Sequence, residues 1–173
     1  MLAVLRPFPN SPNGPIERIE VQLIREGGVL WLRYTAMGDM NGVAWPDEAP
    51  QARTDDLWRH TCFEAFVGGP DGYREYNLAP SRRWASYDFD GYRSGMREAA
   101  EIVTIEPLDL AFDQLAIEAR IELPFEGGNI GLSAVIEDIG GNKTYWALAH
   151  PSDKPDFHHP DSFTLVLPAP EHP

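Results

Sequence analysis

Short runs in which apolar and polar residues alternate are the feature that most constrains the fold of this 173-residue chain. The clearest run covers residues 114–123, where every second residue from Leu115 to Leu123 is apolar and those between are mostly polar. A period of two places the two sets on opposite faces of a β-strand. Residues 16–25 alternate similarly, and Gly27 and Gly28 separate them from an apolar run at 29–36. These two segments predict a β-hairpin.

Turn residues divide most of the remaining chain into further short strands. Glycine and proline supply 31 of the 173 residues and cluster between the apolar runs, as in Gly-Gly-Pro-Asp-Gly at 68–72. Strands are expected in the ranges 16–25, 29–36, 61–80 (two strands), 83–92, 114–123, 129–138, 143–150 and 163–167. Residues 1–15 predict an extended lead-in, 37–56 a long loop and 168–173 a tail. The best helical candidate, at 94–100, is short.

About ten short strands, without a sustained helical period or a long repeat, predict a single all-β domain over residues 1–173. The expected architecture is an antiparallel β-sandwich of the jelly-roll or immunoglobulin-like kind, and a closed barrel is the nearest alternative.

The charge balance excludes some classes of partner. Asp and Glu number 27 against 14 Lys and Arg, a formal charge of −13. We therefore expect no nucleic-acid partner and no docking on an anionic membrane, since both need a basic surface. The single cysteine, Cys62, rules out an intramolecular disulfide. No signal peptide or apolar span of ~20 residues is recognised, so a cytoplasmic protein is expected.

Aromatic residues concentrate in residues 58–92, where arginines and acidic residues lie among them. Alternation places Glu64 on one strand face with Phe66, and Glu75 on one face with Asn77 and Tyr73. If Phe66 pairs with Tyr73, Glu64 faces Glu75, which is unfavourable unless the two carboxylates are solvated or bridged. Aromatic rings in strands usually pack in a core. At this density, beside carboxylates and an amide, they also suit a flat ligand with polar edges, such as a sugar.

A second group of candidates lies at 144–163, where three of the five histidines occur. His158, His159 and Asp161 are candidate metal ligands, although their spacing matches no established zinc motif. The alternative is a proline-stiffened loop whose histidines form ordinary hydrogen bonds. The chain has no Gly-x-Ser-x-Gly motif and no phosphate-binding loop.

Three stretches carry a resemblance to a known family. DLWRHTCFEAFV (56–67), YREYNLAPSRRWASYDFDGYR (73–93) and YWALAHPSDKPDFHHPDSFTL (145–165) resemble the bacterial DOMON-like ligand-binding domains, which are related to DOMON domains and family-nine carbohydrate-binding modules. The resemblance covers about residues 55–167. It implies a β-sandwich with a ligand cleft on one sheet, in a group whose relatives bind sugars or haem. Glu64, Glu75, Asn77 and Trp84 fall on the matching strands. Haem-binding relatives use Met and His as axial ligands, and this chain offers no such pair at matching positions.

The sequence thus predicts a non-catalytic domain without a cofactor, which binds a carbohydrate or a similar small polar molecule in an aromatic and polar cleft. The candidate ligand-binding residues are Trp58, His60, Glu64, Glu75, Asn77, Trp84, Tyr87, Arg93, Tyr145, Trp146, His150 and His158. Two alternatives stay open. One is a haem- or metal-binding domain, and the other is a hydrolase or isomerase that uses Glu64 and Glu75 with a histidine such as His60 or His150.

Overall fold

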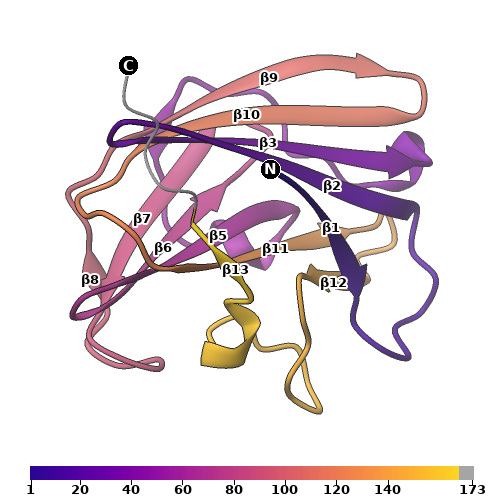
Figure 1. Cartoon of the computed structure of the whole chain (residues 1–173). Helices are drawn as coiled ribbons and strands as arrows, with labels where there is room; N and C mark the ends of the chain where they lie inside the picture. Colours follow the sequence, from indigo (N-terminus) through magenta and orange to yellow (C-terminus); the bar gives the residue numbers. More distant parts are fainter. Residues whose placement is uncertain (168–173) are drawn as a thin grey trace.

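The computed structural model describes residues 1–167, except the side chains of 109–111, and its regular elements are β-strands and three short 3-10 helices (Figure 1). The strands are β1 (Leu2–Pro7), β2 (Ile16–Glu26), β3 (Val29–Gly38), β4 (Ala52–Arg53), β5 (Cys62–Gly69), β6 (Gly72–Leu78), β7 (Arg83–Phe89), β8 (Arg97–Glu98), β9 (Val103–Ala111), β10 (Gln114–Glu122), β11 (Asn129–Glu137), β12 (Lys143–Ala147) and β13 (Leu165–Val166). The helices are η1 (Met40–Gly42), η2 (Leu57–Arg59) and η3 (Pro160–Ser162). The all-β prediction is confirmed.

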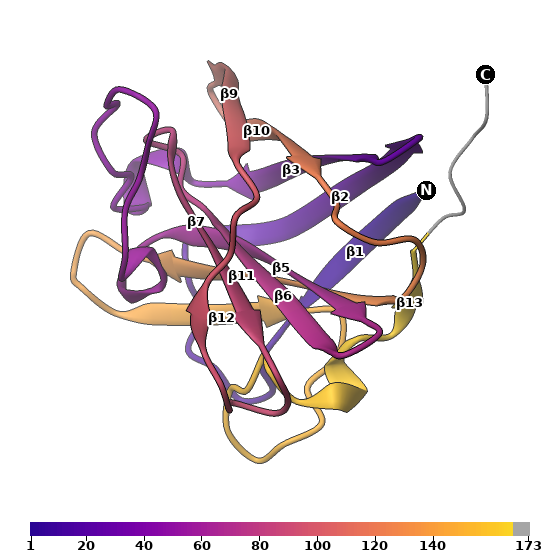
Figure 2. The ribbon, with the colours of Figure 1, turned by 90° about the vertical axis from the view of Figure 1, so that its left-hand side faces the viewer.

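Hydrogen bonds join the strands into one curled sheet of mixed type. Its order is β4-β7-β6-β5-β11-β12-β1-β2-β3-β10-β9, with β8 added beside β7 and β13 beside β11. Strand β1 connects the two halves, because Leu2 to Leu5 pair with β2 whereas Arg6 and Pro7 pair with β12. Figure 2 shows β2, β3, β9 and β10 along one side of the curl and β5, β6, β11 and β12 along the other. The result is a half-barrel.

Four segments differ from the prediction. Residues 52–53, expected within the loop 37–56, form β4, which pairs in parallel with β7. Residues 2–7, expected within a lead-in, form β1, because Ala3 and Leu5 point into the protein interior. Residues 94–100, the helical candidate, contain the extended β8, which pairs with the end of β7. Strand β9 was not predicted, although Val103 and Ile105 alternate in it and both are fully buried. The tail at 168–173 lies outside the described residues.

The inward side chains of both halves form one main core, whose fully buried members include Ile19, Leu23, Leu30, Leu32, Tyr34, Phe63, Tyr76, Leu78, Ile105, Ile117, Ile121 and Ile130. Tyr34 of β3 links the two halves. Its ring centroid lies 4.9 Å from that of Phe63 on β5, and its hydroxyl donates a 2.7 Å hydrogen bond to the carbonyl of Glu64. The backbone that carries Glu64 is therefore held from inside the core.

The opposite face of β5, β6 and β7 is covered as well. Phe66, Tyr73, Ala85, Tyr87 and Phe89 form an outer cluster there, against which Phe157 and Phe163 pack. The last two belong to the segment after β12, which lies on the side of the sheet away from β2 and β3 (Figure 1). No helix in the described part of the chain has the length and apolar character needed to cross a membrane.

Two tyrosines of the main core give a matched test of this packing. Tyr34→Phe removes the hydrogen bond to the Glu64 carbonyl, so we expect a loss of about 1 kcal/mol in the free energy of unfolding. The hydroxyl of Tyr76 is buried and finds no hydrogen-bond partner among the described residues, so Tyr76→Phe is expected to be neutral or stabilising. Urea unfolding of both variants measures the difference. Equal losses in the two variants would contradict the conclusion that the Tyr34 hydroxyl is hydrogen-bonded and the Tyr76 hydroxyl is not.

Candidate functional site

A cleft of about 960 Å³ opens on the outer face of the half formed by β5, β6, β7, β11 and β12. Glu64 of β5, Glu75 of β6 and Val135 of β11 form its floor. The walls come from the η2 segment, strand β7 and the turn that follows it, strand β12 and the loop after it. Their lining residues are Asp56, Trp58, Arg59, His60, Tyr87, Phe89, Arg93, Met96, Lys143, Tyr145, Pro155, Phe157 and His158.

The register of β5 and β6 decides how the two carboxyl groups meet. The prediction that paired Glu64 with Glu75 is wrong by two residues, because Glu64 pairs with Asn77 and Glu75 with Phe66. The two glutamates are therefore diagonal neighbours on one face of the sheet. Asn77 donates from Nδ2 to Glu75 Oε1 at 2.7 Å. Ser133, which is paired with Glu64 across β11, donates from Oγ to Glu64 Oε2 at 3.1 Å.

Burial raises the proton affinity of both carboxyl groups. Glu64 and Glu75 are only 3% and 5% exposed. Burial, strengthened by the nearby charge of Glu75, raises the pKa of Glu64 to about 8. Burial also raises the pKa of Glu75 to about 7, although the hydrogen bond from Asn77 and the charge of Arg93 oppose the shift. Near neutral pH the floor therefore presents both a carboxylic acid and a carboxylate.

His158 reaches this floor from the loop after β12 and is enclosed by aromatic rings. Its ring centroid lies 5.0 Å from that of Phe66 and 5.1 Å from that of Phe89. This burial, with the positive charge of Arg93, lowers the pKa of His158 to about 4. The imidazole is therefore neutral at physiological pH.

Both ring nitrogens of His158 lie close to polar groups. The hydroxyl of Tyr73 lies 2.7 Å from His158 Nδ1 and accepts a hydrogen bond from the backbone N–H of Arg93 at 3.3 Å. If the hydroxyl of Tyr73 donates its proton to Nδ1, the ring proton of the neutral imidazole lies on Nε2. Nε2 lies 3.6 Å from Oε2 of Glu75. In that tautomer the imidazole N–H is directed at the carboxyl group on the cleft floor.

Asp156 connects the loop after β12 to the turn between β7 and β8. It accepts hydrogen bonds from the hydroxyl of Tyr92 at 2.6 Å and from Nη2 of Arg93 at 2.8 Å. Burial works against its charge, but these hydrogen bonds outweigh burial and lower the pKa of Asp156. Arg93 also has a φ of 51°, in the left-handed region that few non-glycine residues occupy. The turn between β7 and β8 is therefore joined to the loop after β12 by two hydrogen bonds at this point.

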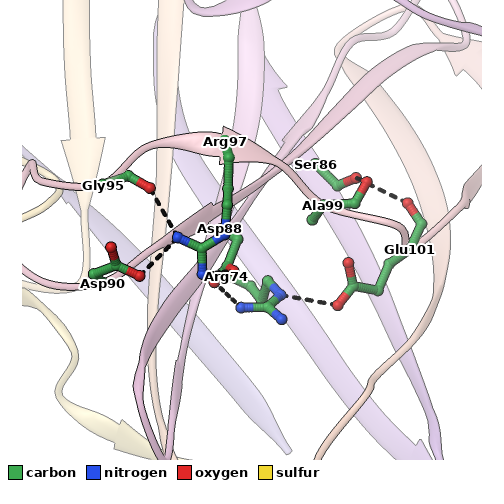
Figure 3. A network of polar contacts seen from close by, with 8 residues as sticks. All are labelled: Arg74, Ser86, Asp88, Asp90, Gly95, Arg97, Ala99 and Glu101. Carbon is green, nitrogen blue, oxygen red and sulfur yellow. Dashed lines mark hydrogen bonds and ion pairs between the residues drawn. The ribbon is translucent and has the colours of Figure 1, made fainter.

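A polar network fixes the other end of the same turn (Figure 3). Arg97 of β8 forms ion pairs with Asp88 and with Asp90, the latter at 2.7 Å. Arg74 of β6 contacts Asp88 from the other side and donates to Glu101 at 2.9 Å. Strands β6, β7 and β8 are therefore tied together beneath the turn that carries Arg93 and Met96 into the cleft.

Eight of the twelve candidate ligand-binding residues line the cleft, namely Trp58, His60, Glu64, Glu75, Tyr87, Arg93, Tyr145 and His158. The other four lie elsewhere. Asn77 is fully buried beneath the floor, where it supports Glu75. Trp84 and Trp146 point to the other face of their strands and pack in the main core. His150 contacts the carbonyl of Arg6 through Nε2 at 2.8 Å.

The metal candidates do not converge. No group of three or more His, Cys, Asp and Glu side chains within residues 1–167 is arranged to hold a metal ion. His158 faces Tyr73 and Glu75. His159 caps η3, where its Nδ1 accepts the backbone N–H of Asp161 at 3.2 Å.

Several lining residues were not among the candidates. Phe89 had a signal, because it follows Tyr87 by two residues and shares its strand face. Lys143 had one as well, because it precedes Tyr145 by two residues at the start of β12. Met96 and Phe157 had none, because they lie in a turn and a loop, which lack a periodic pattern that places their side chains.

Comparison with known proteins bears on the fold. No protein-family model matches the chain, and no curated protein matches its sequence. Among solved structures, it is similar to a family-nine carbohydrate binding module from Caldicellulosiruptor kristjanssonii in complex with cellotriose. The TM-score is 0.50 at 12% sequence identity, over 88% of this chain and 74% of that chain. The fold is thus like that of a family-nine module. The closer kinship with DOMON-like domains stays a prediction.

The buried carboxyl of Glu64 predicts a specific dependence of stability on pH. Because its pKa is higher in the folded state than the ordinary value of 4.5, its stabilising contribution is complete below about pH 4.5 and is lost as the pH rises through about 8. Glu64→Gln should therefore be more stable than the wild type at pH 9, by several degrees in Tm, with a smaller gap at pH 6. Thermal unfolding at both pH values measures this.

Glu118→Gln is the control, since Glu118 lies on β10 outside the cleft in an ion pair with Arg33. Its effect should be small and similar at the two pH values. A Glu64→Gln effect that does not change with pH would refute a proton held on Glu64.

Proposed function

We propose that this protein binds a carbohydrate in the cleft, as a domain with the β-sandwich architecture of family-nine modules. In this interpretation β4, β7, β6, β5, β11 and β12 form the layer with the cleft, and β2, β3, β10 and β9 form the other. The observation that carries the proposal is the composition of the cleft, in which aromatic rings line the walls around a floor of two carboxyl groups. The bound cellotriose of the structurally similar module supports this ligand class.

The walls offer rings on which the C–H face of a pyranose can stack. Tyr145 of β12 and Phe157 of the following loop lie with ring centroids 6.2 Å apart. Trp58 of η2 is 48% exposed, and the guanidinium of Arg59 lies 5.3 Å from the centre of its ring. Large rings of this kind combine apolar area with few rotatable bonds, so they bind a ring-shaped ligand at low entropic cost.

The floor suits the hydroxyl groups of a sugar. A hydroxyl both donates and accepts, and a protonated Glu64 beside an ionised Glu75 provides the complementary acceptor and donor groups. The pair carries less negative charge than two carboxylates. Burial of an uncharged ligand against it therefore costs less than burial against two full charges.

Haem fits this cleft poorly. Met96 and His158 both line it, and they are the residue types that haem-binding relatives use. However, Nδ1 of His158 bonds Tyr73 and its Nε2 faces Glu75 at 3.6 Å, inside a ring of aromatic side chains. Coordination to iron would require the imidazole to leave these contacts.

Sugar binding can be tested by calorimetry and by the intrinsic tryptophan fluorescence of the protein, to which Trp58 in the cleft wall contributes. The panel is D-glucose, D-galactose, D-glucuronate, cellobiose and maltose at millimolar concentration. Tyr145→Ala removes one stacking surface, so we expect the affinity for the best ligand to fall by roughly tenfold.

Trp31→Ala is the matched control, because Trp31 lies on β3 outside the cleft, near Arg120. It should leave the affinity unchanged. If no sugar of the panel produces heat or a fluorescence change, the proposed function is wrong. An equal loss with Trp31→Ala would place the ligand elsewhere.

A further inference from the structure

The two carboxyl groups on the cleft floor have different hydrogen-bond partners, and this difference assigns them different tasks. We propose that the cleft also interconverts the anomers of an aldose bound there, with Glu75 as the general base and Glu64 as the general acid. The inference rests on the proposed function, since the sugar must first bind. The sequence predicted a non-catalytic domain, so this inference adds an activity. The histidine beside the two carboxyl groups is His158, whereas the sequence suggested His60 or His150.

The partners of Glu75 favour its ionised form. Asn77 donates an N–H to Oε1 at 2.7 Å, and Nε2 of His158 lies 3.6 Å from Oε2. The positive charge of Arg93 acts in the same direction. Oε2 makes no hydrogen bond within the described part of the chain, so it is available to accept a proton from a ligand hydroxyl.

The partners of Glu64 favour its protonated form. The carboxyl group is more deeply buried and has no cation or N–H donor within hydrogen-bond distance among residues 1–167. Its one side-chain partner is the hydroxyl of Ser133, which donates to Oε2. The charge of Glu75 beside it favours retention of the proton. Oε1 has no partner in the described structure, so this oxygen can donate its proton to a ligand.

The placement of the two groups favours isomerisation over hydrolysis. Glu64 and Glu75 project from adjacent antiparallel strands on one face of the sheet, so they approach the same edge of a bound ring. A glycosidase instead places its two carboxyl groups on either side of the scissile bond, where one of them activates a water or attacks the sugar. The anomeric carbon of a free sugar carries two oxygens, O1 and the ring O5, on one edge. One acid and one base side by side match these two atoms.

The reaction needs no further reactant. Glu75 takes the proton of the O1 hydroxyl while Glu64 gives its proton to O5, so the C1–O5 bond breaks and the open-chain aldehyde forms. After rotation about C1–C2, O5 attacks the other face of C1. Glu75 returns its proton to O1, and Glu64 takes back the proton of O5. Both carboxyl groups end in their starting states, and no atom or electron is gained or lost.

The protonation states of Glu64 and Glu75 define how the rate of anomer interconversion should depend on pH. The activity requires Glu75 ionised and Glu64 protonated, so it should rise as Glu75 loses its proton and fall as Glu64 does, with a maximum between the two steps. The titratable and charged groups that face the pair from the surrounding elements are Cys62, Tyr73, Tyr87, Arg93, Lys143, Tyr145, Asp156 and His158, with Asp56, Arg59 and His60 of the η2 segment.

The test is polarimetry on freshly dissolved α-D-glucose and α-D-galactose at low buffer concentration, with calorimetry on the same samples. We expect micromolar protein to shorten the approach to anomeric equilibrium. Glu75→Gln and Glu64→Gln should each lower the catalysed rate by about a hundredfold or more, while calorimetry still detects the sugar. Glu75→Asp, which keeps a base on a shorter side chain, should retain part of the activity. Glu118→Gln, on β10, should retain all of it.

The outcomes separate the two proposals. If a sugar binds but its anomers equilibrate no faster than with Glu75→Gln or with buffer alone, the inference is overturned and the proposed function stands. If the wild-type rate survives in both glutamine variants, the inference is again overturned. If none of the sugars binds, the proposed function fails and the activity fails with it.

Discussion

The part of the sheet formed by β5 and β6 is buried on both faces, and the other features of the site follow from this constraint. One face meets the main core through Phe63, Tyr76 and Leu78, and the other carries Glu64 and Glu75. A carboxyl group in such a position must be hydrogen-bonded, paired with a cation or protonated. The structure uses two of these solutions: amide and hydroxyl donors, and retained protons. The chemical character of the cleft floor is thus a consequence of where the sheet places it.

The loop after β12 completes this burial and also carries a polar side chain, His158, to the cleft floor. Phe163 stacks at 5.9 Å on Phe66, and a side chain at Gly131 of β11 would approach Phe163 to 2.8 Å, so the loop packs closely on the sheet. That packing delivers His158 to Glu75. The loop that packs on Phe66 through Phe163 is thus the same loop that carries His158 to within 3.6 Å of Glu75.

Strand alternation was enough to predict which side chains share a face, but not which residues pair. The sequence placed Glu64 with Phe66, and Glu75 with Asn77, on common faces, and the structure agrees. The register failed because the connection between β5 and β6 is a two-residue turn at Pro70 and Asp71, which pairs Gly69 with Gly72. A turn centred one residue earlier gives the predicted pairing instead. Gly72 is specific to this turn, since its φ is 132° and a Cβ there would lie 1.9 Å from the carbonyl of Phe89.

Which face of a strand becomes the core was harder to predict for aromatic residues. Trp84 and Tyr87 lie on one strand, three residues apart, so they point to opposite faces, and composition alone fits either residue to either face. The outcome depends on β9 and β10, which cover one face, and on the loop after β12, which covers the other. Neither contact is encoded near Trp84 in the sequence. The loop residues Phe157 and Met96 lacked even a periodic signal, so their place in the cleft follows only from tertiary packing.

The cleft is less negatively charged than the net charge of the whole chain suggests. Lys143 lies opposite Glu137 in the pairing of β11 with β12, yet within residues 1–167 it forms no ion pair, because Glu137 contacts Nδ1 of His60 at 2.6 Å instead. Arg59 and Arg93 on the same walls form ion pairs with Asp56 and Asp156, so their charges are balanced locally, and Glu64 retains its proton near neutral pH. A neutral or weakly anionic molecule therefore meets less repulsion in the cleft than the net charge of −13 suggests. The charge of Lys143 and the proton held by Glu64 disfavour a cationic ligand, and this electrostatic preference agrees with the hydroxyl-rich ligand that the floor can bind.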